Sequence, residues 1–146
     1  MKFSKRTEYA IRALVHFAKL GTGSYAQSRD LSRQERLPTK FLESVLLGLK
    51  RHGYLESKVG SGGGYRLARP ASRVIIGELI RKLEDHDLPG LPESPGSDAV
   101  PGEAALHLIQ ARITKAHAEV LDGLTLEEVV DEVQRNGMSR DAMYYI

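Results

Sequence analysis

Residues 57–70, SKVGSGGGYRLARP, place four glycines between Lys58 and Arg66. Glycine lets the backbone approach another molecule closely, and the two cations favour a polyanion. Nucleotide motifs do not fit, because the dinucleotide fingerprint needs glycine at Tyr65 and a P-loop needs Lys and then Ser or Thr after Gly64. We interpret the stretch as the tip of a β-hairpin that contacts nucleic acid; a merely mobile tip is the alternative.

Helical spacing in residues 38–53, PTKFLESVLLGLKRHG, separates an apolar face from a polar face. The apolar face contains Phe41, Leu42, Val45, Leu46 and Leu49, and the opposite face contains Thr39, Lys40, Glu43, Ser44, Leu47 and Arg51. In a helix-turn-helix the N-terminal residues of the second helix reach base edges in the major groove. A carboxylate such as that of Glu43 gains nothing from phosphates but accepts from the cytosine amine. The alternative is a glutamate favoured by the helix dipole or paired with Lys40.

Other basic and backbone groups are predicted to contact DNA without reading it. Cations near the ends of two helices suit phosphates: Lys2, Lys5, Arg6, Lys50 and Arg51. The hairpin is predicted to contribute Lys58, Ser61, Gly62, Gly63 and Arg66, with its cations in a narrow minor groove.

The distribution of charge supports this interpretation. The 146 residues carry a net charge of +2, but residues 1–73 hold 15 Lys and Arg against 5 Asp and Glu, while residues 74–146 hold 6 against 14. A basic half joined to an acidic half indicates that only the first meets a polyanion, although an uneven solvated surface is the alternative.

The remaining patterns give the order of the elements. We expect a helix over residues 5–20 that stops at Gly21, a short helix over 28–36, the polar-faced helix with Pro38 in its first turn, and two strands around the glycines. Three helices followed by a two-stranded ribbon form a winged helix-turn-helix. The predicted fold is therefore mainly α with a small β-hairpin wing, and residues 1–73 are its DNA-binding region.

Residues 74–146 are expected to form a linking helix, a loop over 86–102, a long helix over 103–122 and a C-terminal helix. The inward face of the C-terminal helix is predicted to contain Leu126, Val129, Val130 and Val133. Pro101 suits the start of the long helix and Gly123 its end. Spacings of three and four place apolar residues along one seam, as in a helix that pairs with a second copy: Leu106, Ile109, Ile113, Ala116 and Val120. A helix buried within its own chain is the alternative.

Four segments together resemble the Rrf2 family of bacterial transcription regulators, which includes the IscR, NsrR and CymR types. They are MKFSKRTEYAIRALV, LPTKFLESVLLGLKRHGYLESKVGSGGGYRLAR, VIIGELIRKLED and LTLEEVVDEV. The resemblance implies a homodimer on a roughly palindromic operator, recognition through Thr39, Lys40 and Glu43, and a last helix that packs back near the DNA-binding half. Where many members have arginine before the first glycine of the wing, this chain has Val59.

The same resemblance bears on cofactors. Cluster-binding relatives hold an iron–sulfur centre with three cysteines in the loop, and this chain has no cysteine. His107 stands where IscR-type members carry a histidine ligand, and Glu8 matches an acidic position that some relatives use. Imidazole and carboxylate would suit Zn, Fe or Mn, with His86 or Asp87 as additions; a surface histidine and a helix-capping glutamate are the alternative.

These observations predict a DNA-binding transcription regulator, most simply a repressor, rather than an enzyme. No run of about 18 apolar residues predicts a membrane span, and no signal-peptide pattern is present, so we expect a cytoplasmic protein. The alternatives are a regulator that needs a metal, a small-molecule effector or a protein partner, and a small His/carboxylate enzyme.

Overall fold

The computed structural model describes residues 2–84 and 94–138. Its elements in chain order are α1 (Lys5–Leu20), α2 (Ser28–Glu35), α3 (Thr39–Arg51), β1 (Leu55–Lys58), β2 (Gly64–Leu67), the 3-10 turn η1 (Ala71–Arg73), α4 (Ile76–Leu83), α5 (Pro101–Asp122) and α6 (Leu126–Met138). This order confirms the mainly α fold with a β-hairpin wing that the sequence predicts. Part of the predicted loop over 86–102 lies outside the described residues.

Local chemistry sets the ends of the helices. The Ser4 hydroxyl accepts the Thr7 backbone N–H at 3.2 Å and so starts α1. Helix α2 ends one residue earlier than predicted, because Arg36 adopts a left-handed conformation with φ 54°. Pro38 precedes α3 as its N-cap rather than lying in its first turn.

The core joins α1 to α3 and extends well beyond residue 73. Its buried members are Ala10, Ala13, Leu14, Phe17, Leu31, Leu37, Leu42, Val45, Leu46, Leu49, Tyr54, Leu55, Val74, Ile76, Leu79, Ile80, Leu126 and Val130. Phe41 was predicted to belong to it but is 37% exposed, with its ring edge-on to Tyr9 at 5.2 Å. The hydrophobic core therefore includes α4 and α6, and the division into functional halves at residue 73 stays a prediction.

The wing is an antiparallel pair that is attached to the chain before α2. Strands β1 and β2 align Leu55 with Leu67, and Ala26 exchanges both backbone hydrogen bonds with Tyr65 at 2.9 and 2.8 Å. Gly64 (φ 132°) permits this contact, because a Cβ there would lie 2.3 Å from the Ala26 carbonyl oxygen.

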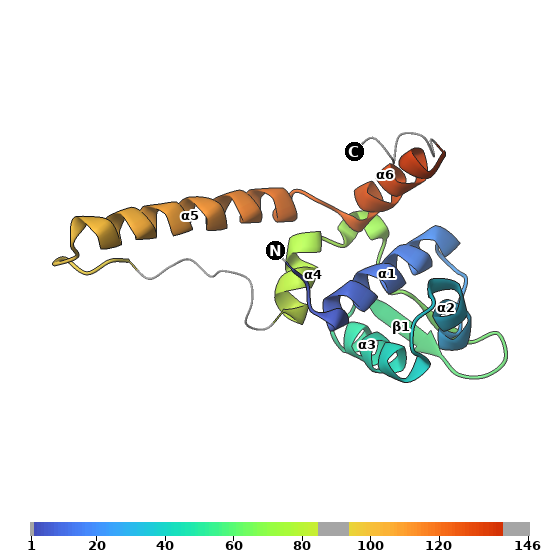
Figure 1. Ribbon diagram of the computed structural model, residues 1–146. Coiled ribbons are helices and arrows are strands. Elements are labelled where there is room, and N and C mark those ends of the chain that lie inside the picture. The colour runs from blue at the N-terminus through green and yellow to red at the C-terminus, as the bar shows by residue number, and fades with distance from the viewer. Residues whose placement is uncertain (1, 85–93, 139–146) are drawn as a thin grey trace.

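The last two helices separate in space (Figure 1). Helix α5 extends away from the rest of the protein and meets α4 at its C-terminal end, where Gly77 allows close approach to Leu121 and Asp122. Helix α6 turns back onto α1 and η1 and buries Leu126 and Val130. Val133 was expected to face inward but is 47% exposed, since it lies beyond the part of α6 that contacts the core.

We predict that Gly64→Ala destabilises the protein by more than about 2 kcal/mol, because the added Cβ meets backbone and the φ value disfavours L residues. Gly62→Ala is the matched control: Gly62 also has a positive φ (73°), but nothing lies within 4 Å of its added Cβ, so a cost of about 1 kcal/mol is expected. Urea denaturation measures both. Equal losses would show that the contact with Ala26 contributes nothing.

Candidate nucleic-acid interface

The turn between α2 and α3 orients the first residue of α3. The Ser32 hydroxyl donates to the Leu37 carbonyl at 2.6 Å and lies 2.9 Å from the Thr39 hydroxyl. Because a hydroxyl has one hydrogen, Ser32 must accept from Thr39. The Thr39 oxygen then keeps its lone pairs for an incoming donor.

The polar side of α3 faces solvent as predicted. Its exposed residues are Thr39, Lys40, Glu43, Ser44, Leu47 and Arg51. They offer hydrogen-bond donors, hydrogen-bond acceptors and one apolar side chain, which are the groups that base edges and the thymine methyl require. The core that buries the opposite side of the helix leaves these groups unobstructed.

Glu43 lies in the second turn of α3, whose first turn contains no acidic residue. The alternative of a dipole-stabilised first-turn glutamate is therefore wrong, and no ion pair joins it to Lys40 within the described residues. Its nearest partner is the Ser28 hydroxyl at 3.5 Å. Burial, and secondarily the charge of Glu43, raise the pKa of Tyr65 in the wing. The carboxylate thus stands between α2 and the wing with its acceptor capacity largely unused.

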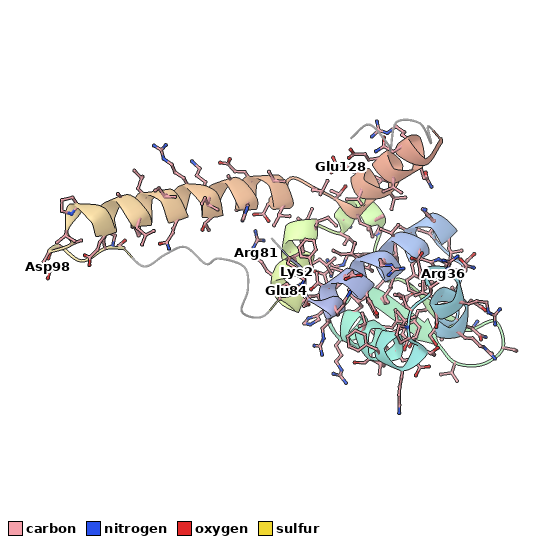
Figure 2. All side chains as sticks on the ribbon, in the orientation of Figure 1. Lys2, Arg36, Arg81, Glu84, Asp98 and Glu128 are labelled. Carbon is pink, nitrogen blue, oxygen red and sulfur yellow. The ribbon has the colours of Figure 1, made fainter. Side chains whose placement is uncertain are left out.

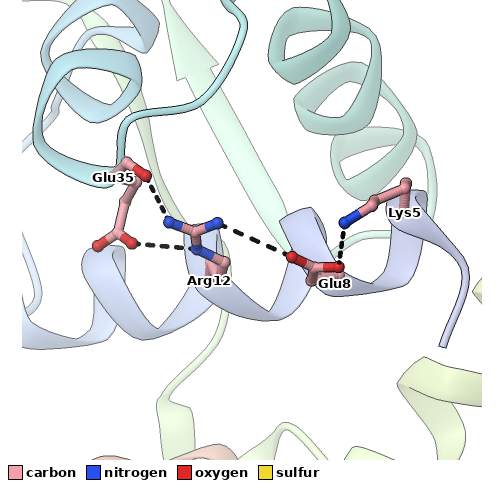
Figure 3. A network of polar contacts seen from close by, with 4 residues as sticks. All are labelled: Lys5, Glu8, Arg12 and Glu35. Atoms are coloured by element: carbon pink, nitrogen blue, oxygen red, sulfur yellow. Dashed lines mark hydrogen bonds and ion pairs between the residues drawn. The ribbon is translucent and has the colours of Figure 1, made fainter. Parts of the chain in front are cut away.

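The start of α1 holds a polar network that the sequence did not reveal (Figure 3). Lys5 Nζ lies 3.0 Å from one Glu8 carboxylate oxygen, and Arg12 lies 3.9 Å from the other. Arg12 also pairs with the Glu35 carboxylate at 3.3 Å and donates to the Glu35 carbonyl at the end of α2. These partly exposed contacts hold α2 against α1, while Lys5 shares its charge with Glu8.

Glu84 anchors the segment before α1. Its carboxylate accepts the Ser4 backbone N–H at 2.7 Å. A hydrogen bond from Thr7, followed by those from Ser4, lowers the pKa of Glu84 below its ordinary value. Figure 2 labels Lys2 beside Glu84, and Arg36, the residue that ends α2, on the opposite side of the molecule. The end of α4 thus positions the predicted phosphate contacts Lys2, Lys5 and Arg6, all of which are exposed.

The cations of the wing surround Tyr25, a residue that the sequence did not single out. The Arg66 guanidinium lies 4.5 Å from the Tyr25 ring centre and pairs with Glu56, and Lys58 lies 5.9 Å from the same ring. Arg66 is thus half-buried and engaged, whereas Lys58 is exposed. Lys50, another predicted phosphate contact, donates to the Ser57 hydroxyl at 2.6 Å and ties α3 to β1.

The tip of the wing divides its glycines into two roles. Ser61 and Gly62 are exposed, as a contact with DNA requires, and Val59 beside them is 96% exposed. Gly63 is buried instead, and the backbone lies so close to it that an added Cβ would be 2.2 Å from the Lys58 carbonyl oxygen. The burial of Gly63 assigns it to the folding of the turn rather than to the outer surface.

The chain lacks the thiolates that usually ligate iron–sulfur clusters. It contains no cysteine, and residues 2–84 and 94–138 gather no group of three or more His, Asp or Glu that could hold a metal. Glu8 is engaged by two cations, and His107 lies half-buried on α5. Metal binding by Glu8 and His107 stays a prediction, and His86 and Asp87 lie outside the described residues.

Comparison with known proteins places these features in context. The profile of a family described as "Rrf2: Iron-dependent Transcriptional regulator" matches residues 3–132. An HTH-type transcriptional regulator of Mycobacterium tuberculosis is 33% identical over 84 residues, 58% of this chain and 52% of its own. Protein rrf2 of Nitratidesulfovibrio vulgaris is 30% identical over 89 residues, 61% of this chain and 59% of its own. The chain thus spans a little over half the length of these curated relatives.

Solved structures extend the likeness over nearly the whole chain. CymR, the global cysteine regulator of B. subtilis, superposes with a TM-score of 0.75 at 26% identity and covers 90% of this chain and 98% of its own. T. potens IscR superposes with a TM-score of 0.71 over 99% and 97% of the two chains at 24% identity, which supports the fold alone. Among the described helices none has the length and apolar character to cross a membrane.

We predict that Glu84→Gln destabilises the protein by about 1 kcal/mol at pH 7, because the amide accepts more weakly than the carboxylate. The pKa of Glu84 in the folded state lies below its ordinary 4.5. Stabilisation by the charged form is therefore present above pH 4.5 and is lost as the pH falls through the folded-state pKa. The free energies of unfolding of the wild type and of Glu84→Gln, measured by denaturation, should therefore converge in acid. Glu132→Gln, at an exposed position of α6, controls for the change in net charge. A difference in unfolding free energy between the wild type and Glu84→Gln that stays constant with pH would contradict the stabilising role of the Glu84 carboxylate.

Proposed function

The chain belongs to the Rrf2 family of transcriptional regulators, and on that premise we propose that it is a sequence-specific DNA-binding repressor acting as a homodimer on a roughly palindromic operator. The observation that carries the proposal is the orientation of α3. Its apolar side is buried against α1, and its polar side presents Thr39, Lys40 and Glu43 to solvent at the N-terminal end. In a helix-turn-helix that end contacts bases.

Roles within the interface follow from the chemistry of each group. Glu43 is the reader, since a carboxylate beside DNA is repelled by phosphates and accepts from cytosine. Lys2, Arg6 and Arg51 are exposed cations without ion pairs in the described part of the chain, which suits backbone phosphates. In the wing, Lys58 is the exposed cation that suits an adjacent groove, because Arg66 is held by Glu56 and Tyr25.

The homodimer is proposed from the surface of α5. No residue of this helix is buried, and its apolar seam is 49–68% exposed at Leu106, Ile109, Ile113 and Val120. Ala116 lies exposed on the same seam. Such a continuous apolar stripe costs free energy in water, and a second copy of α5 would cover it with matching spacing. Two copies would then hold two recognition helices for two half-sites.

For the signal that controls DNA binding, we propose a route rather than a specific effector. A metal, a small molecule or a protein partner that changes the angle between two α5 helices would change the separation of the recognition helices, and so weaken both half-sites together. An enzyme built on Glu8 and His107 is disfavoured, because the Glu8 carboxylate is already shared by Lys5 and Arg12.

For Glu43, the residue proposed to contact the bases, we predict that Glu43→Ala lowers the discrimination between base pairs by about 1–3 kcal/mol at one position per half-site. Lys5→Ala should instead weaken binding to all sequences alike. Selection from a randomised duplex pool, followed by affinity measurements, separates the two effects. If Glu43→Ala left the selected sequence unchanged while Lys5→Ala altered it, the groove-facing residues would be assigned wrongly.

For the dimer, we predict that Ile113→Glu shifts the monomer–dimer equilibrium toward monomer by at least about tenfold, since the seam would have to bury a charge. Lys115→Glu, on the same helix but off the seam, is the matched control and should stay dimeric. Sedimentation velocity across a concentration series gives the equilibrium for each. If the wild-type protein were monomeric at every concentration, the proposed homodimer would be refuted, whereas the fold of the single chain would stand.

A further inference from the structure

A cleft of about 160 Å³ lies where α1, α3 and α4 converge. Its lining comes from all three helices: Arg6, Ser44, Val45, Gly48, Arg51, His52, Lys82 and Leu83. Figure 1 shows the N-terminal end of α1 beside α4, with α3 next to them. The volume is several times the roughly 30 Å³ share of a water molecule, so a phosphate group fits.

The charges that line this cleft have one sign. Arg6, Arg51 and Lys82 are cations, and His52 and Ser44 add further hydrogen-bonding groups, whereas no carboxylate is among the described residues that line the cleft. Neither Arg6 nor Arg51 makes an ion pair within the described residues. Three cations around one cavity repel each other, and an anion in the cavity relieves that repulsion through charge-assisted hydrogen bonds.

Lys82, which lines the cleft, is held in place by two neighbouring side chains. Its ammonium donates to Glu78 at 2.7 Å and lies 5.3 Å from the centre of the Tyr54 ring. The hydrogen bond and charge of Glu78 raise the pKa of Lys82, which therefore stays charged. An ammonium has three donors, so one remains after those engaged by Glu78 and Tyr54.

The position of the cleft indicates which anion it takes. Ser44 and Arg51 extend from the same helix as the proposed base reader Glu43, and Arg6 follows Lys5 at the start of α1. A duplex read by α3 brings phosphates past its flanks on both sides of the groove. An anion in the cleft would thus belong to the same DNA that α3 reads.

We propose that this cleft binds a phosphodiester of the operator backbone, and that Lys82 and His52 contact DNA together with Arg6, Ser44 and Arg51. The inference rests on the proposed function but adds a cation from α4, outside residues 1–73. Lys82 lies two residues before Glu84, which anchors Ser4, and one residue after Arg81, which pairs with Asp122 of α5 at 2.6 Å. A phosphate at Lys82 therefore connects the DNA directly to the helix that carries α5.

The test compares substitutions of equal charge on a duplex that the wild-type protein selects. Lys82→Gln should weaken binding about tenfold and lower the slope of log affinity against log salt by about one, for selected and unrelated DNA alike. Lys82→Arg should restore most of the affinity. Lys115→Gln on α5 removes the same charge away from the cleft and should leave both quantities unchanged.

A second substitution fills the cleft without removing a cation. Gly48 lines it within α3, and a Cβ there meets nothing within 4 Å, so Gly48→Glu should fold. Its carboxylate would repel a phosphate, and a loss of affinity greater than that of Lys82→Gln is expected. Gly48→Ala controls for the backbone change and should be at least as stable as the wild type.

The phosphate itself is identified by replacing single phosphates of the duplex with neutral methylphosphonates. At one position per half-site the replacement should cost the wild-type protein about tenfold and cost Lys82→Gln clearly less, because the contact with Lys82 is already lost while those with Arg6 and Arg51 remain. The inference is overturned if Lys82→Gln keeps wild-type affinity and salt slope on DNA that the wild type selects. Failure of the wild type to select any sequence would instead refute the proposed function.

Inorganic phosphate, titrated without DNA and followed through the His52 ring resonances at constant ionic strength, separates the two sources of phosphate. Weak, unsaturated shifts up to millimolar phosphate support a backbone phosphate that needs the rest of the duplex. Saturation well below that concentration, with DNA binding unaffected, would assign the cleft to a small phosphorylated molecule and overturn the inference.

Discussion

The packing of α3 against α1 is the contact on which the rest of the structure depends. Leu42, Val45, Leu46 and Leu49 are almost wholly buried against a surface that includes Ala10, Ala13, Leu14 and Phe17. Each such side chain contributes roughly 1.5–3 kcal/mol on burial, so α3 cannot rotate about its axis without a large loss. Because a helix repeats every 3.6 residues, fixing the buried side also fixes which residues point outward.

The elements that follow from this contact were largely predictable. Periodic apolar residues located α1, α3 and α5, and glycine-rich chemistry located the wing, because both signals are local in sequence. Contacts between distant residues were not predictable, because nothing in the sequence links Glu84 to Ser4 or Tyr25 to Arg66, or places Lys82 and Arg51 around one cleft. The misplaced inward positions, Phe41 and Val133, lie at the edges of apolar faces, where spacing alone does not say how far a partner extends. The burial of Gly63 was not predictable for a related reason, since it depends on the Lys58 carbonyl folded beside it, and its contact with DNA stays a prediction.

The acidic half forms part of the same hydrophobic core as the helix-turn-helix, in addition to carrying the proposed dimer helix. Val74, Ile76, Leu79, Ile80, Leu126 and Val130 belong to the same core as the helix-turn-helix, so α4 and α6 stabilise the DNA-binding unit directly. Helix α5 alone leaves that core, and it remains connected through the close approach at Gly77 and the pair between Arg81 and Asp122. A change at α5 therefore reaches α4 first, and Glu84 at the end of α4 holds the residue before α1.

The central claim is that two copies of this surface read one symmetric site. Its most direct measurement is the selection of sheared genomic DNA by the purified protein at near-physiological salt, with the bound fragments sequenced. The account predicts enrichment of a few sites with two inverted half-sites whose centres lie about one helical turn, roughly 34 Å, or a multiple of it apart. Uniform recovery of fragments, or enrichment of a motif without two-fold symmetry, would contradict it.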